Sequence, residues 1–148
     1  MYVAKEESGG GAHISVSVGN RFPVTDVSYG KWVLAYASEA ERERLLADGL
    51  RQVTPFTNTD VKAYREQLRE IVEAGVLVSS EEYVRGICAI SAPILTSDGL
   101  LGVLATLGIS ATESGDQITK TSAVIRELAS KYSETPAPID LRRNTIPQ

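Results

Sequence analysis

Residues 86–109 read GICAISAPILTSDGLLGVLATLGI, two apolar runs separated by Ser97-Asp98-Gly99. An Asp-Gly step between apolar runs of this length is typical of a tight turn that joins two antiparallel strands. The sequence therefore predicts a hairpin made of strands at 86–96 and 100–109. Pro93 has no N–H to give to a neighbouring strand, so we expect it at a sheet edge or a bulge.

Helical patterns flank this hairpin. Apolar residues at spacings of three and four predict helices near 27–37, 38–49 and 60–74 before it and at 116–132 after it. A capping box at 38–41 starts the second helix. In the third, Asn58 or Thr59 can cap the start, and Gly75 can take the left-handed conformation at the end.

The two ends of the chain show weaker patterns. Residues 1–7 are a candidate strand, Gly9–Gly11 a flexible loop, and 13–18 alternate polar and apolar side chains as a half-buried strand does. The tail 134–148 contains three prolines, and we expect it to be poorly ordered. A further short segment at 76–78 is also predicted to be extended. The fold class is α+β, with one domain at 1–133 in which helices pack against a mostly antiparallel sheet.

Composition excludes several classes of protein. The 148 residues carry a net charge of −4, with nine basic and eleven acidic groups in 1–74 and six and eight in 75–148. This even spread offers no basic stripe for nucleic acid. The N-terminus lacks a signal peptide, and the longest apolar run, 99–109, is about half of what a membrane helix needs. We expect a soluble, cytoplasmic protein with no membrane partner.

Residues for catalysis are scarce. His13 is the single histidine and Cys88 the single cysteine, so a histidine-rich zinc site, a cysteine-based metal site and an internal disulfide are excluded. No GxSxG turn occurs, and Cys88 lies in a strand where a small buried hydrophobe is the simpler interpretation than a reactive thiol. We predict no enzyme activity, no catalytic residue, no metal and no cofactor.

Several short segments follow one another in a recognisable order. They are VGNRFP (18–23), YGKWVLA (29–35), FTNT (56–59), LREI (68–71), Gly75, Glu81-Glu82, Gly86 and Ala92-Pro93. This order resembles the effector-binding domain of IclR-type bacterial transcription regulators over residues 2–133. The resemblance implies a GAF-like sensor domain for a small molecule, often an organic or aromatic acid. It also implies a homodimer or homotetramer, and DNA binding only through an N-terminal winged helix-turn-helix that we expect to be absent from this chain.

The resemblance also implies a ligand pocket. Carried over by position, the pocket residues are Ser28, Tyr29, Gly30, Ser79, Ala89, Thr106 and Gly108. Arg85 is a secondary candidate on other grounds, because it lies directly before Gly86 and could reach a carboxylate if its strand end faces the pocket. Amides at the helix start near 28–30 could hold a carboxylate, and the hydroxyls at 79 and 106 would add donors.

Three of these positions depart from the family pattern. Tyr29 replaces a small residue, so it either narrows the pocket or stacks on an aromatic ligand. Ser79 stands where an Asp is common, and the loss of that negative charge favours an anionic ligand. Gly108 replaces a frequent Ser and opens space in the pocket. From the residues alone, Ser28 is a plain helix-start residue, Thr106 a strand residue, and Arg85 a solvent-facing side chain.

Two other functions stay open at this point. The first is an oligomerisation module whose pocket is filled by its own side chains, Tyr29 above all. The second is a GAF-like redox enzyme, which generally needs paired cysteines where this chain has Cys88 alone.

Overall fold

The computed structural model describes residues 1–6, 14 and 16–133. Its sheet contains three antiparallel strands in the order β1 (Leu77–Ser80), β2 (Ile87–Thr96) and β3 (Gly99–Ile109). The helices are α1 (Gly30–Tyr36), α2 (Glu39–Leu46), α3 (Val61–Ala74) and α4 (Gly115–Lys131), with short 3-10 turns η1 (Val24–Asp26) and η2 (Ser110–Thr112). The α+β class predicted from the sequence is confirmed.

β2 and β3 form the predicted hairpin, with β2 as the central strand of the sheet. Gly99 has φ +115° in the connecting turn, a conformation that favours glycine. Pro93 lies in the central strand but beyond the last residue of β2 that pairs with β1, Ser91, and next to a register shift at Ile94/Leu95. At that position β2 has a neighbour on one side only, so the missing N–H is tolerated.

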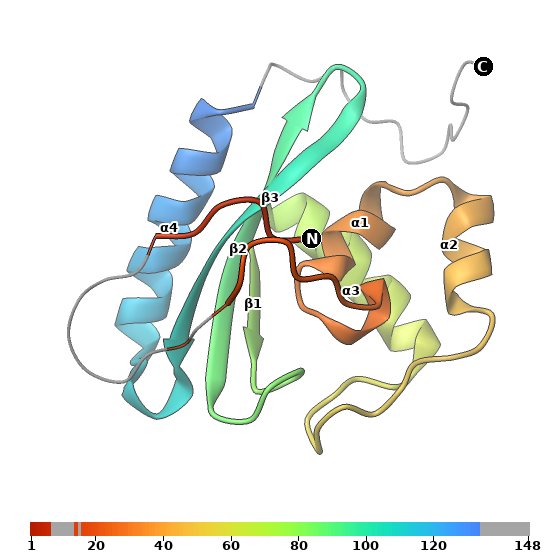
Figure 1. Cartoon of the computed structure of the whole chain (residues 1–148), viewed down its shortest axis with the longest axis horizontal. Helices are drawn as coiled ribbons and strands as arrows, with labels where there is room; N and C mark the ends of the chain where they lie inside the picture. The colour runs from red at the N-terminus through yellow and green to blue at the C-terminus, as the bar shows by residue number, and fades with distance from the viewer. Residues whose placement is uncertain (7–13, 15, 134–148) are drawn as a thin grey trace.

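Helices cover both faces of the sheet (Figure 1). On one face Cys88, Ile90 and Ala92 pack with Ile125 and Ala129 of α4. The opposite face packs against α1 and α3, in a cluster that contains Trp32, Leu34, Tyr64, Leu68, Ile71 and Leu77. Strand alternation therefore places β2 side chains in the core under α4, whereas the sheet supplies the other core from Leu77 of β1 and from Leu100 and Val103 of β3.

Local capping chemistry sets the helix ends. Ser38 accepts a hydrogen bond from the Glu41 amide at 3.2 Å, which confirms the predicted start of α2. The cap of α3 is corrected: Asp60, which follows the predicted caps Asn58 and Thr59, accepts from the amides of Lys62 and Ala63. Asn58 instead accepts from the Asp60 amide, which positions that cap. Gly75 ends α3 with φ +66°, as expected.

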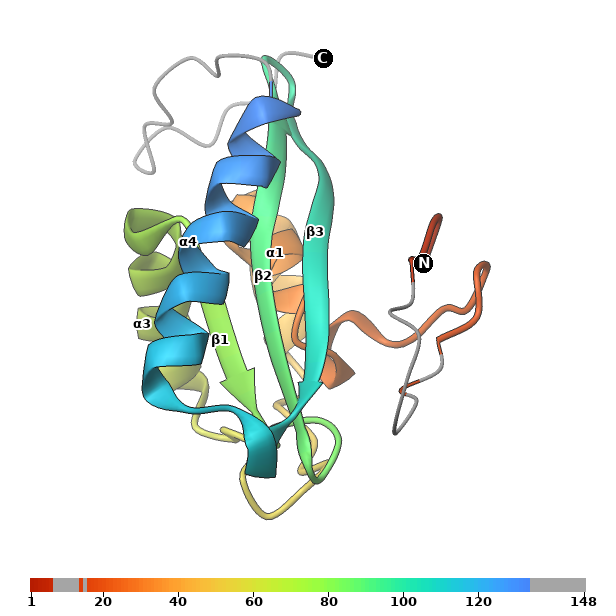
Figure 2. The ribbon, with the colours of Figure 1, turned by 90° about the vertical axis from the view of Figure 1, so that its left-hand side faces the viewer.

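The N-terminal strands are not formed in the described residues. Positions 1–6, 14, 16 and 17 have no strand assignment, and Tyr2 instead exchanges two backbone hydrogen bonds with Gly19 and Asn20. This segment lies beyond β3, apart from the sheet (Figure 2). An alternating pattern predicts a strand but cannot supply its neighbour. The loop Gly9–Gly11, His13 and the tail 134–148 lie outside the described residues.

Candidate functional site

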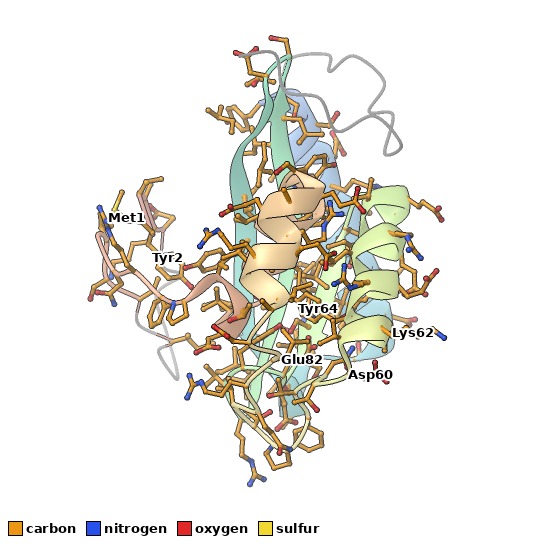
Figure 3. All side chains as sticks on the ribbon, turned by 90° about the vertical axis from the view of Figure 1, so that its right-hand side faces the viewer. Met1, Tyr2, Asp60, Lys62, Tyr64 and Glu82 are labelled. Atoms are coloured by element: carbon orange, nitrogen blue, oxygen red, sulfur yellow. The ribbon has the colours of Figure 1, made fainter. Side chains whose placement is uncertain are left out.

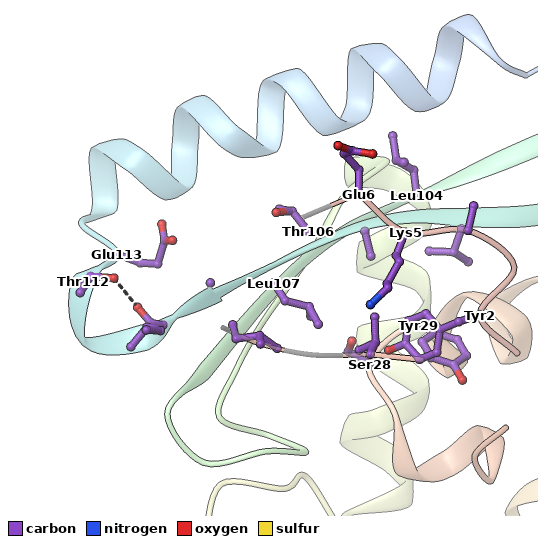
Figure 4. Close-up of a pocket in the computed structure, with 17 residues that line it drawn as sticks. Tyr2, Lys5, Glu6, Ser28, Tyr29, Leu104, Thr106, Leu107, Thr112 and Glu113 are labelled. Carbon is purple, nitrogen blue, oxygen red and sulfur yellow. Dashed lines mark hydrogen bonds between the residues drawn. The ribbon is translucent and has the colours of Figure 1, made fainter. Parts of the chain in front are cut away.

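A cavity of about 470 Å³ runs along the outer edge of β3 (Figure 4). Because β3 is an edge strand, consecutive residues 103–109 from both of its faces reach this cavity. The N-terminal segment and the turn before α1 form the other wall. Its further lining residues are Tyr2, Ala4, Lys5, Glu6, Ile14, Val16, Ser28, Tyr29, Thr112 and Glu113.

Four of the eight predicted pocket residues line this cavity. Ser28 and Tyr29 come from the turn between η1 and α1, and Thr106 and Gly108 come from β3. The Tyr29 hydroxyl is buried, and no described residue forms a hydrogen bond with it. The Tyr2 ring meets the Tyr29 ring edge-on, with 5.6 Å between the ring centroids. Burial raises the pKa of the Tyr29 phenol, so it stays a neutral donor at physiological pH.

Ser79 and Ala89 do not line this cavity, and strand register explains the separation. Ser79 pairs with Ala89 on the face that packs against α1 and α3. Thr106 pairs with Ile90, and Gly108 with Cys88, on the α4 face.

A bulge accounts for the difference from the expected pocket. At the turn Leu95 pairs with Leu100, and an unbroken ladder from there would place Ala89 opposite Thr106. The shift at Ile94/Leu95 places Ala89 opposite Leu107 instead. A register change of one residue moves a side chain to the other face of the sheet.

Ser79 belongs to a buried polar group that we call the Lys31 cluster: Lys31, Gln67, Ser79 and Glu82. The Lys31 ammonium lies 2.7 Å from Glu82 Oε2 and 2.8 Å from Gln67 Oε1, and the Ser79 hydroxyl donates to Glu82 Oε2 at 2.8 Å. Lys31 is fully buried. Burial lowers the pKa of its ammonium, and the Glu82 carboxylate partly offsets that effect.

Two tyrosine rings complete the surroundings of this cluster. The Lys31 Nζ lies 5.4 Å from the Tyr64 ring centroid and 5.5 Å from that of Tyr83. Burial raises the pKa of both phenols. Figure 3 shows Tyr64 and Glu82 turned toward the interior, whereas Lys62 on the same helix as Tyr64 points away. The sequence held one signal that was missed: Lys31 is the only charged residue in GKWVLAY.

Gly30 has a packing role rather than a place in the cavity wall. A Cβ at this position would lie 2.7 Å from the carbonyl carbon of Val24 and still closer to its oxygen. The Gly30 amide donates to the Val27 carbonyl at 3.1 Å, so it is not available to the carboxylate expected at this helix start. The prediction of a Gly30 amide in the pocket is therefore corrected. Arg85 is exposed between β1 and β2 and lies outside the cavity lining.

The space that Gly108 leaves is occupied by Glu113. A Cβ on Gly108 would collide with the Glu113 carboxylate, which folds back from the end of η2 over the strand. Cys88, paired with Gly108, is buried. Burial, and next the nearby Glu113 charge, raises the pKa of the thiol, which is the opposite of what a reactive cysteine requires.

A smaller hollow of about 180 Å³ lies between α1, α2 and α3. Arg42, Arg65 and Arg69 line it, but each has a partner. Arg42 donates to three carbonyls at the end of α1, Arg65 pairs with Glu43, and Arg69 pairs with Glu66. These arginines stabilise helix ends and helix contacts, so the cavity at β3 is the better candidate for a ligand.

The described part of the chain contains neither a cluster of metal-ligating side chains nor a membrane-spanning helix. Residues 1–6, 14 and 16–133 contain no group of three or more His, Cys, Asp or Glu that could hold a metal ion. Within the same residues, no helix has the length and hydropathy needed to cross a bilayer.

Comparison with known proteins identifies the relatives of this chain. Residues 1–134 match the family model described as bacterial transcriptional regulator IclR, C-terminal. The chain is 34% identical to the p-hydroxybenzoate hydroxylase transcriptional activator of Acinetobacter baylyi over 84 residues, 56% of this chain and 31% of that protein.

Solved structures agree. An IclR transcriptional regulator from Alicyclobacillus acidocaldarius superposes with a TM-score of 0.78 and 33% identity over 85% of this chain and 51% of that one. The inducer-binding domain of PobR from Acinetobacter, a double mutant in complex with 3-hydroxybenzoic acid, has a TM-score of 0.73 and 23% identity over 84% of this chain and 74% of that one. The chain thus spans about a third of the first relative and half of the first structure.

Proposed function

Because the chain belongs to the IclR family of bacterial transcriptional regulators, we propose that it is the effector-sensing part of such a regulator and binds a small carboxylic acid in the cavity beside β3. DNA binding would then reside in a separate domain of the regulator. A cytoplasmic location and assembly into dimers or tetramers belong to the same proposal. The homologues are regulators rather than enzymes, and we assign this chain no catalytic activity.

One observation carries the proposal: the cavity combines a cation, hydroxyl donors and apolar walls. Lys5 is the one cation among the described lining residues, and its side chain reaches toward Ser28 and Tyr29 (Figure 4). Leu104 and Leu107 of β3 contribute apolar surface. A pocket with apolar walls and a few convergent polar groups is the usual form of a small-molecule site.

Aromatic acids are the first compounds to test. The relative with 34% identity is named for activating a hydroxylase of p-hydroxybenzoate. The Tyr2–Tyr29 ring pair lies in the wall of the cavity and offers a surface for an aromatic ring. Ser28, Tyr29, Thr106 and Gly108 remain proposed ligand-binding residues, while Gly30, Ser79, Ala89 and Arg85 are proposed only to shape or flank the domain.

The test is a thermal-shift series on the purified chain with acetate, pyruvate, benzoate, 3-hydroxybenzoate and 4-hydroxybenzoate. A ligand at about 100 times its Kd adds about 2.7 kcal/mol to the free energy of unfolding, and so raises Tm by roughly 5–10 °C. The Lys5→Gln variant should lose most of this gain. Lys62→Gln, an exposed lysine on α3, is the matched control and should keep it. If none of these acids raises Tm, the alternative of an oligomerisation module that binds no ligand would be favoured.

A further inference from the structure

Glu113 places a carboxylate in the wall of the cavity. It follows η2, and its backbone amide donates to the Ser110 carbonyl at 3.3 Å. Its side chain is half-buried over Gly108, where any larger residue would displace it. No described residue forms a hydrogen bond or salt bridge with this carboxylate. The neighbouring Thr112 hydroxyl does not serve it, because it donates to the Ile109 carbonyl at 2.9 Å.

Charged groups of both signs line the cavity: Lys5 and Glu6 in the N-terminal segment, and Glu113 after η2. Lys5, Ser28 and Tyr29 gather at one end, and Glu113 lies at the other, beyond Thr106 and Leu107 (Figure 4). The end with Lys5, Ser28 and Tyr29 supplies hydrogen-bond donors, whereas the ionised Glu113 carboxylate can only accept hydrogen bonds. A ligand that was a simple acid would satisfy the first end and leave the Glu113 carboxylate to water.

We infer that Glu113 determines specificity by accepting a hydrogen bond from the ligand, and that the effector is therefore a hydroxy acid. The carboxylate of the effector lies toward Lys5, and the hydroxyl of the effector donates a hydrogen bond to Glu113. The inference rests on the proposed function and deepens it. It also explains a glycine at 108: the residue makes room for the carboxylate that recognises the ligand.

A site that is built to bind a hydroxyl rejects the analogue that lacks it, because a buried polar group is then left unpaired. Hydrogen bonds to charged groups are the stronger ones. We expect the wild-type chain to bind 3-hydroxybenzoate or 4-hydroxybenzoate about tenfold or more tightly than benzoate.

The experiment is isothermal titration of benzoate and the two hydroxybenzoates into four forms of the full chain. The wild type should prefer a hydroxybenzoate. Glu113→Met, of similar length without an acceptor, should bind benzoate as the wild type does and lose the preference. Gly108→Ala, which displaces the Glu113 carboxylate without removing it, should reduce the preference. Glu73→Gln changes an exposed carboxylate on α3, outside the cavity lining, and should retain it.

The outcomes separate this inference from the proposed function. If benzoate binds and the added hydroxyl changes its Kd less than twofold in the wild type, the inference is overturned and the acid sensor stands. The same holds if Glu113→Met keeps the full preference. If none of the three acids binds at millimolar concentration, the sensor proposal falls and this inference falls with it.

Discussion

Replacing Lys31 by methionine removes the cation from the Lys31 cluster and leaves the buried Glu82 carboxylate without its counter-charge. Glu82 would keep the hydrogen bond from Ser79 at 2.8 Å but lose both contacts from the Lys31 ammonium. Gln67 would lose its donor as well. Methionine preserves most of the aliphatic stem, so the change isolates the charge rather than the packing.

Removing one partner of a buried ion pair costs about 3–5 kcal/mol, because the remaining charge is uncompensated. A domain of this size has about 5–15 kcal/mol of stability, so Lys31→Met should remain folded but weakened. With a slope near 2 kcal/mol per molar, the urea midpoint should fall by roughly 2 M. Fluorescence of Trp32, the single tryptophan and fully buried, reports the transition.

The double variant Lys31→Met/Glu82→Gln supplies the decisive comparison. It removes both charges and leaves Ser79 an amide oxygen as acceptor, and replacing both members of a buried pair is often close to neutral. We therefore expect it to recover most of the loss. Lys62→Met, an exposed change on α3, should stay within about 0.5 kcal/mol. The reasoning is refuted if Lys31→Met costs no more than Lys62→Met, or if the double variant is no more stable than the single one.

Three further predictions concern the packing around the site. Gly30→Ala should cost about 1–3 kcal/mol or more in chemical denaturation, because its Cβ would press on the rigid backbone of Val24; an unchanged midpoint would contradict this contact. Ser91→Ala should cost about 1–3 kcal/mol, because the buried Trp32 Nε1–H donates to the Ser91 hydroxyl at 2.9 Å, and a stability equal to wild type would show that the indole finds another acceptor. Cys88 of the folded chain should react slowly with iodoacetamide near pH 8.5, because burial raises the pKa of its thiol and so disfavours the reactive thiolate. The urea-unfolded chain should react rapidly, and equal rates for the two forms would contradict a buried thiol.

Local chemistry was readable from the sequence. The Asp-Gly turn predicted the hairpin, and the capping box at Ser38 and the glycine at position 75 set helix ends where the structure has them. In each case the signal and its effect lie within a few residues of one another. The cap of α3 was misplaced by one residue or two because Asn58, Thr59 and Asp60 are all good caps.

Tertiary pairing was not readable in the same way. The bulge at Ile94/Leu95 adds one residue to one strand, and nothing in the apolar runs marks its position. That single residue separates Thr106 and Gly108 from Ser79 and Ala89, which the resemblance had placed together. Half of the predicted pocket therefore lines the cavity, and the other half shapes or flanks the domain elsewhere.

The pairing of Lys31 with Glu82 joins residues 51 positions apart, beyond the reach of any local pattern. Likewise, the place of Glu113 over Gly108 depends on how η2 turns the chain back toward β3. Both features required the fold before their chemistry could be recognised.

The location of the ligand site is the central claim, and a titration of the isotopically labelled chain followed by amide chemical shifts tests it most directly. With 4-hydroxybenzoate as the probe, the largest shifts should fall on Ser28, Tyr29 and residues 103–109, with Lys5 and Glu113 at the two ends. Amides around Arg65 and Arg69, which line the smaller hollow, should not move. Shifts centred on the Lys31 cluster or on the smaller hollow, with β3 unaffected, would contradict the account.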